Sequence, residues 1–409
     1  MYPQNVAFDW KMKTKFNIVF FITLIATAKV VYAQDSLMSR AFHFSYYNQF
    51  DLRNSSTNAI STHRMLHDVF RKGIHRKMNG RWGTISYGLF SFTTTYLTML
   101  WSHEFGHSLR AKQVGGHFNI HNFGLPIPYT TMHLPESISL IDEALSVTAG
   151  FEVNTLNIRA LQKDFIVGNG ICNEDLALSF ANRIMYPLYS SVIVPRDPKD
   201  KDVWINTAGD PIHIALAVFK NYSGGQLFMP DSTVNPQLVR YYNQSSIFAL
   251  LINLTDPHFY KEVAAAFGRK KLRTPVFLIG DHTNGWTYGT LFNTSPLGYE
   301  LYLNNYIQIS NRTFSVYFKY GNPFKNNGLG LNWYNIIGNK RIHLSAGIDV
   351  WDQDLFGKGL SGEVSTEIKI SDHFGISSSM GYKTKGYVLG KQIQEGLNLG
   401  VGIQIHSKY

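Results

Sequence analysis

The sequence predicts an α+β protein in which a mostly helical N-terminal part precedes a C-terminal part of antiparallel strands. Two patterns predict this class. Between about residues 55 and 268, apolar residues recur at intervals of three and four, whereas from about residue 274 they alternate with polar residues. We therefore expect a helical domain over 34–268 and an antiparallel β domain over 269–409, which is either barrel-like or a sandwich.

The composition favours a folded protein with membrane-facing β structure. Aromatic residues make up 14% and charged residues 16% of the chain, whereas charged residues supply about a quarter of a typical soluble domain. The formal net charge is +10, but no long Lys or Arg block and no nucleic-acid motif accompanies it. We therefore expect no nucleic-acid partner and some attraction to anionic lipid headgroups. Cys172 is the only cysteine, so any metal must be bound by His and carboxylate side chains.

The N-terminus has the three parts of a secretory signal. Three lysines between positions 11 and 15 precede an apolar run over 16–27, and Val31-Tyr32-Ala33 follows. We expect cleavage after Ala33, so that 1–33 is a signal peptide and the mature chain is exported to the cell envelope, at the outer membrane or in the periplasm. The alternative is an uncleaved anchor in the inner membrane, although about 12 strongly apolar residues fall short of the roughly 20 that a spanning helix needs.

At least six helical segments are expected in the first part, separated by Gly and Pro clusters. They lie near 57–77, 83–114, 137–163, 173–193, 211–221 and 236–267, and the last is expected to be interrupted around Asp256-Pro257. Residues 82–101 contain no charged side chain and have a tryptophan at each end, so this stretch could cross or enter a bilayer. Its many Thr, Ser and Gly residues are equally compatible with a buried helix in a globular core.

The second part consists of alternating runs that end at Asn, Gly, Asp and Lys turn signals. The runs cover 299–303, 313–320, 328–334, 342–350, 361–370, 374–382 and 397–406. Several are about 10 residues long and have apolar residues on one face, as do the strands of outer-membrane barrels. A soluble β-sandwich with one wet face is the alternative interpretation.

The strongest functional motif is His103-Glu104-Phe105-Gly106-His107, within the second expected helix. Residues four apart lie on one helix face about one turn apart, so the imidazoles of His103 and His107 can reach one cation. Glu104 lies where its carboxylate can hydrogen-bond a metal-bound water instead of binding the metal itself. The motif therefore predicts a zinc site in which Glu104 is the general base.

A zinc peptidase site needs a third protein ligand and an open position for water. Two carboxylates are candidates for this ligand. Glu152 lies in an otherwise apolar helix, where a buried carboxylate is costly unless it is paired or binds a metal. Asp210 lies at the expected start of a helix, where capping is the ordinary role of an aspartate. These considerations leave both residues open.

Three motifs resemble those of the site-2 protease family of intramembrane zinc metallopeptidases. The run 103–116, followed by Asn122-Phe-Gly-Leu-Pro, resembles the first motif of that family. Ala149-Gly-Phe-Glu-Val-Asn154 is similar to its second motif, Ala-Gly-Pro-x-Ala-Asn. Gly209-Asp-Pro-Ile-His213 resembles its third, Leu-Asp-Gly-Gly-His. The three motifs occur in the order of the family and cover about residues 85–220.

The resemblance implies a zinc-metallopeptidase-like helical domain that hydrolyses a peptide bond in a protein or peptide substrate. His103, His107 and Asp210 would bind Zn²⁺, Glu104 would activate the water, and Asn154 would contact the substrate. The chain departs from the second motif by the additional Glu152, which stays an alternative ligand or a carboxylate that supports the ligands. The competing expectation is a non-catalytic outer-membrane or structural protein of the envelope.

Overall fold

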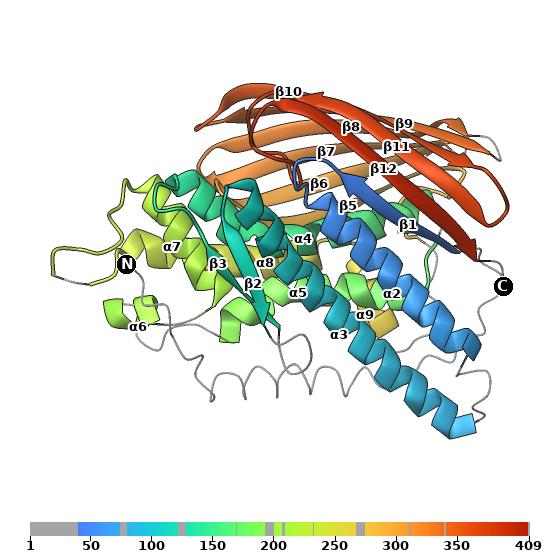
Figure 1. Ribbon diagram of the computed structural model, residues 1–409, viewed down its shortest axis with the longest axis horizontal. Helices are drawn as coiled ribbons and strands as arrows, with labels where there is room; N and C mark the ends of the chain where they lie inside the picture. Colours follow the sequence, from blue (N-terminus) through green and yellow to red (C-terminus); the bar gives the residue numbers. More distant parts are fainter. Residues whose placement is uncertain are drawn as a thin grey trace.

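The computed structural model describes residues 40–407 apart from 74–79, 122–127, 169, 193–199, 207–208, 232, 267–274, 311 and 339–340. The expected signal peptide over 1–33 and the run 122–126 lie outside the described residues. The described chain forms a group of helices and a large antiparallel sheet that arches over them (Figure 1). The expected α+β class, with helices before strands, is confirmed.

Apart from α6, the described helices follow the expected segments closely. They are α2 (Arg53–Gly73), α3 (Gly80–Gln113), α4 (Leu140–Val167), α5 (Asn173–Val192), α6 (Lys201–Asn206), α7 (Asp210–Tyr222), α8 (Pro236–Leu254) and α9 (Phe259–Ala266). The last expected segment is two helices, because the chain turns between α8 and α9 at Asp256-Pro257, where proline disfavours a helical residue before it. Within the described residues no helix, including the part of α3 over 82–101, is long and apolar enough to cross a membrane.

One sheet contains ten of the described strands. They are β1 (Arg40–Tyr47), β4 (Ile279–Gly280), β5 (Asn284–Ser295), β6 (Gly298–Ile309), β7 (Arg312–Pro323), β8 (Asn326–Gly338), β9 (Ile342–Gln353), β10 (Gly357–Lys369), β11 (Phe374–Lys383) and β12 (Gly396–Ser407). The spatial order is β1-β12-β11-β10-β9-β8-β7-β6-β5-β4, so the sheet is open, with β1 and β4 at its edges. The seven expected alternating runs correspond to β6–β12.

The first strand departs from the expected division of the chain. We expected 34–268 to be helical, but β1 pairs along its length with β12 at the other end of the chain. Its alternation of Phe42, Phe44 and Tyr46 with polar residues is a strand signal. A second, small sheet is the hairpin of β2 (His117–His121) and β3 (Tyr129–His133), which packs against α3.

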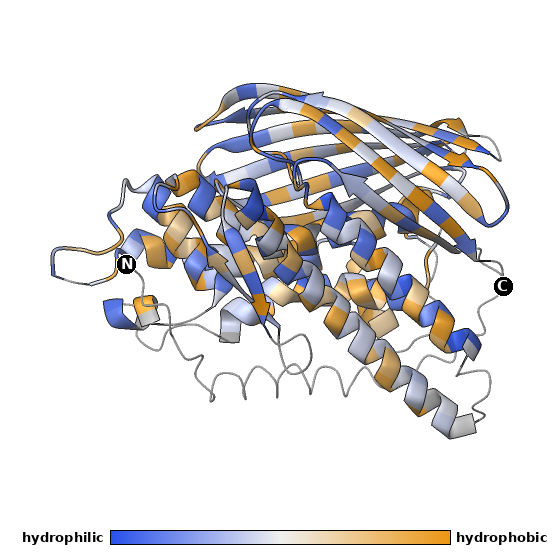
Figure 2. Ribbon diagram, viewed as in Figure 1, coloured by the Kyte–Doolittle hydropathy of each residue, from blue (hydrophilic) through white to orange (hydrophobic). Residues whose placement is uncertain are grey.

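The helices and the sheet share one interior. Along most strands hydrophobic and hydrophilic residues alternate (Figure 2). Helix α4 packs against α2, α3, α5 and α7 and also against β5. One hydrophobic cluster joins Phe151 of α4 to Phe292 and Tyr299 of the sheet, and another joins Leu156 to Tyr302. Helix α4, which packs against the helix of the histidine motif, is therefore held in place by the strands.

Candidate metal centre

Helices α3 and α4 approach closely at two glycines. A Cβ atom on Gly106 would lie 2.7 Å from the carbonyl oxygen of Ala149, and a Cβ atom on Gly150 would overlap the imidazole of His103. A side chain at either position would push the helices apart or displace the ring. The glycine between Glu104 and His107 is thus explained by the passage of α4 across this face of α3.

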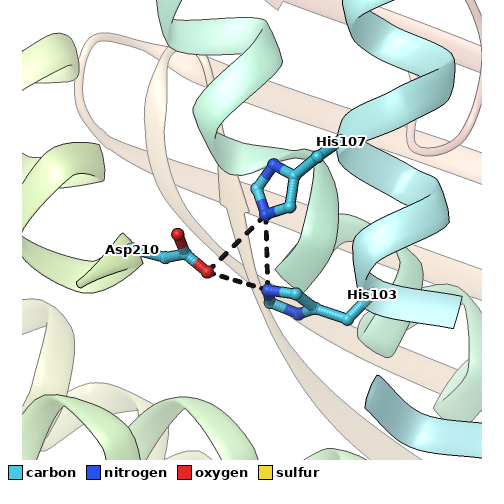
Figure 3. Close-up of side chains that lie close together, drawn as sticks. All are labelled: His103, His107 and Asp210. Carbon is cyan, nitrogen blue, oxygen red and sulfur yellow. Dashed lines mark hydrogen bonds and ion pairs between the residues drawn. The ribbon is translucent and has the colours of Figure 1, made fainter. Parts of the chain in front are cut away.

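Figure 3 shows that His103 and His107 of α3 and Asp210 of α7 point toward one another. The Nε2 atom of His103 lies 2.8 Å from Oδ2 of Asp210 and 3.3 Å from Nε2 of His107. The third distance, from Nε2 of His107 to Oδ2 of Asp210, is 3.6 Å. Three potential ligand atoms from two helices therefore meet at one point, and this group could hold a metal ion.

The spacing of these atoms suits zinc. Zn²⁺ binds imidazole nitrogen and carboxylate oxygen at about 2.0–2.2 Å in tetrahedral geometry, which places neighbouring ligand atoms about 3.3 Å apart. The three distances between the potential ligand atoms, 2.8, 3.3 and 3.6 Å, are close to that value. His103 and His107 are 2% and 4% exposed, whereas the Asp210 side chain is 30% exposed. Solvent can therefore approach the three ligand atoms from the side of Asp210.

The second nitrogen of each imidazole has a hydrogen-bond acceptor. Nδ1 of His103 lies 2.7 Å from Oδ1 of Asn154, and Nδ1 of His107 lies 2.9 Å from the carbonyl oxygen of Ser146. If each Nδ1 carries the proton and donates it to these oxygens, each Nε2 keeps a free lone pair directed at the metal position. Helix α4 thus fixes both the ring orientation and the tautomer of the two histidines.

Asn154 is itself held by a buried amide network. Its Nδ2 donates to Oδ1 of Asn182 at 2.6 Å, and Asn157 donates to the same oxygen at 3.1 Å. Asn157 also donates to the hydroxyl of Ser102, the residue before the motif. Because these side chains come from α3, α4 and α5, the position of His103 depends on the packing of three helices.

The charges of the site stabilise one another. Burial alone would raise the pKa of Asp210, but His107 and His103 hold it well below its usual range. Burial alone would lower the pKa of His107, but Asp210 raises it to about 9. A carboxylate and two imidazoles so placed provide the negative charge and the nitrogen donors that a divalent cation requires.

Glu104 lies beside this group and is 8% exposed. Burial raises its pKa, while His103 and His107 act in the opposite direction. Its backbone carbonyl accepts a hydrogen bond from the hydroxyl of Thr130 in β3, which attaches the β2–β3 hairpin to the motif. A carboxylate with a raised pKa is suited to take and return a proton near neutral pH.

The structure does not bring Glu152, the other candidate ligand, to the histidines. Oε1 of Glu152 accepts hydrogen bonds from Arg110 at 2.8 Å and from the N–H of Gly390 at 2.7 Å. Arg110 and Glu152 are both buried, so the carboxylate is neutralised by an arginine one turn after the motif. Among the described residues, the group that could hold a metal contains Asp210 and not Glu152.

Two further side chains near the site were not assigned a role from the sequence. Burial raises the pKa of Tyr189 of α5, and the nearby carboxylates of Asp210 and Glu104 raise it further. His213 lies one turn after Asp210 in α7, and its side chain is exposed. His213 belongs to the third motif, whereas Tyr189 has no local sequence signal because only the packing of α5 brings it here.

Comparisons with known proteins add no family assignment. No family model matches the chain, and no curated protein matches it. The solved structure of outer-membrane expressed OmpT of Vibrio cholerae is similar over 30% of this chain, with 11% sequence identity and a TM-score of 0.21. The chain spans half the length of that protein. This similarity is too low to support a statement on function, which therefore depends on the site alone.

Proposed function

We propose that the chain is a zinc-dependent peptidase of the cell envelope, with His103, His107 and Asp210 as ligands. The observation that supports this proposal is the convergence of their three ligand atoms beside the carboxylate of Glu104. An ion bound there would polarise a peptide carbonyl and make a bound water acidic. The resemblance to the site-2 protease family, the export of the chain and its action on a protein or peptide remain parts of this proposal.

In the proposed reaction, Glu104 removes a proton from the attacking water and returns it to the leaving amine. His103 and His107 keep their Nε2 lone pairs available because Asn154 and the Ser146 carbonyl accept their Nδ1 protons. Asn154 uses both its oxygen and its amide nitrogen within the protein. We therefore assign it the positioning of His103, and its contact with the substrate stays a prediction.

The test compares zinc content and cleavage in variants of the full chain. We expect Glu104→Gln to keep one equivalent of zinc and to lose hydrolysis, because the amide cannot accept the proton. We expect His103→Ala to lose both. Zinc is measured by atomic emission after dialysis, and cleavage by mass spectrometry of new N-termini in an envelope protein extract.

Glu143→Gln is a matched control, because Glu143 lies in the first turn of α4 and pairs with Lys220 on the surface. It should change neither zinc content nor cleavage. Unchanged zinc binding in His103→Ala would refute the site. Zinc binding by the unmodified protein without any cleavage would instead support a non-catalytic envelope protein that uses the metal for stability.

A further inference from the structure

The sheet presents an apolar surface to the exterior. Large apolar side chains of β6–β12 that point away from the helices are 38–62% exposed. Among them are Leu303, Phe318, Leu331, Ile348, Val364, Met380 and Val401. The strand register places such residues side by side: Phe318 pairs with Leu329, and Leu329 with Val350. The outward surface is therefore continuous across the strands.

The opposite face of the sheet, toward the helices, is mostly polar, although tyrosines such as Tyr302 and Tyr317 also lie on it, and much of it is buried. Glu300, Asn304, Lys319 and Gln404 point toward the helices and are at most 7% exposed. There Lys319 forms an ion pair with Glu300 at 3.2 Å. A half-buried sheet in water has its apolar face inside and its polar face outside. This sheet has the reverse polarity, which is the arrangement of strands that face lipid.

On the outward face of the sheet, charged side chains are confined to the two ends of the strands. Arg312, Arg341 and Asp372 lie at the turns of one end, and Lys325 and Lys358 lie at those of the other. Between these ends, the outward positions of β6–β12 carry no charged residue in the described chain. In β12 the outward apolar residues run from Leu397 to Ile405.

The height of this apolar surface fits a bilayer. The eight residue steps from Leu397 to Ile405 span roughly 27 Å along the strand. At the strand tilt usual for such sheets this is about 20 Å across the membrane, close to the apolar band of roughly 25 Å in outer-membrane proteins.

An open sheet in hydrocarbon needs partners for the polar groups of its edge strands. At the β1 edge, α2 supplies them. Three α2 side chains, spaced so that they lie on one helix face, each bond to both the N–H and the carbonyl of one β1 residue. The pairs are Asn54 with Tyr47, Asn58 with Ser45 and Ser61 with His43.

Side chains also cover the edge of β5 beyond its short pairing with β4. The N–H of Thr290 donates to Asp256 at 3.0 Å, and its carbonyl accepts from Arg183 at 2.8 Å. The carbonyl of Phe292 accepts from the hydroxyl of Thr155 at 2.9 Å. Both sides of the sheet therefore end against helices that satisfy backbone groups, as a low-dielectric environment requires.

We propose that the outer face of this sheet is embedded in the hydrocarbon of a lipid bilayer, with its edges sealed by these helical side chains. Apolar exposure continues past both edges, on α2 at Met65, Leu66 and Val69 and on α8 at Ile247, Leu250, Leu251 and Leu254. Helix α2 contacts β1, and α8 contacts β5. Lipid surrounds a protein on every side, whereas a second copy of the chain would cover one face. The two charged ends match the two headgroup layers.

The test uses adjacent residues on opposite faces of β10. Val364 points outward, whereas Ser365 points toward the helices. The single native cysteine, Cys172, is buried and is replaced by alanine. Val364→Cys and Ser365→Cys are labelled with bimane in the full chain, which is then reconstituted into phosphatidylethanolamine and phosphatidylglycerol vesicles. Near-UV circular dichroism confirms that each variant is folded.

With doxyl groups on the lipid acyl chains, we expect Val364→Cys to lose most of its fluorescence and Ser365→Cys to lose little. Asp372→Cys, at a turn, should be quenched by aqueous iodide instead. Equal quenching at 364 and 365, or quenching of 364 by iodide alone, would overturn the proposal. So would pyrene excimers at 364 in vesicles, because they would show that a second copy covers this face. The metal site plays no part in these outcomes.

Discussion

At the residue scale, the position of His103 is set from two sides. Gly150 leaves the space that the imidazole occupies, and Asn154 binds the Nδ1 atom. The two requirements come from one helix, α4, on which Gly150 and Asn154 lie four residues apart and so face the same way. The second motif of the sequence is thus explained by the placement of the His103 imidazole.

Asn154→Ala should weaken zinc binding about 10- to 100-fold, the usual effect of losing a partner that orients a ligand. Asn154→Asp keeps the acceptor oxygen for His103 and should retain more of the affinity than the alanine variant. Competition with a zinc-binding dye measures both. If Asn154 acts only through general packing, the two variants will bind zinc equally, and the assigned positioning role fails.

The sequence predicted the histidine pair and Glu104 because their chemistry depends on spacing within one helix. The residue types alone could not choose between Asp210 and Glu152, because that choice depends on contacts between distant segments, and only the family resemblance favoured Asp210. Glu152 is paired by Arg110, but the N–H of Gly390, its other donor, comes from the loop between the last two strands. Tyr189 was missed for the same reason.

At the element scale, alternation identified β6–β12 but not the pairing of β1 with β12. Alternation shows which residues share a face and contains no information on which strands are neighbours. The strand β1 also depends on α2 for its free edge. A link between α2 and the middle of the sheet adds to this contact, because Arg53 forms ion pairs with Asp51 and with Glu363 of β10.

The Arg53–Glu363 link predicts a pH-dependent contribution to stability. Glu363 forms ion pairs with Arg53 at 2.7 Å and with Lys391 at 3.2 Å. Because these cations stabilise the ionised carboxylate in the folded state, ionised Glu363 stabilises the fold above about pH 5. This contribution decreases as the pH falls and the carboxylate is protonated.

Urea unfolding in detergent micelles tests this link. Glu363→Gln should lower the free energy of unfolding at pH 6, and the difference from the unmodified protein should shrink steadily toward pH 3. Glu395→Gln, at an exposed loop position, is the control and should show no such trend. A difference that stays constant between pH 6 and pH 3 would mean that the ion pair does not contribute as argued.

At the scale of the whole molecule, the loop between β11 and β12 returns to the helices that carry the metal site. Tyr387, Leu389 and Lys391 of this loop are buried. Arg110 donates to the carbonyl of Lys391 as well as to Glu152. One buried ion pair thus joins α3, α4 and the last hairpin of the sheet. Sequence patterns gave no indication of these contacts, because the residues that form them lie up to 281 positions apart in the chain.

Variants of the Arg110–Glu152 ion pair can distinguish a structural role of Glu152 from a metal-binding role. Arg110→Met leaves a buried carboxylate without its cation and should destabilise the fold by about 3–5 kcal/mol. The double variant Arg110→Met with Glu152→Leu removes both charges, so it should recover much of that loss. Recovery will be incomplete, because the N–H of Gly390 loses its acceptor. Because Asp210 and not Glu152 completes the proposed ligand set, the folded double variant should still bind one equivalent of zinc. Loss of zinc from a double variant whose stability has recovered would instead identify Glu152 as a ligand.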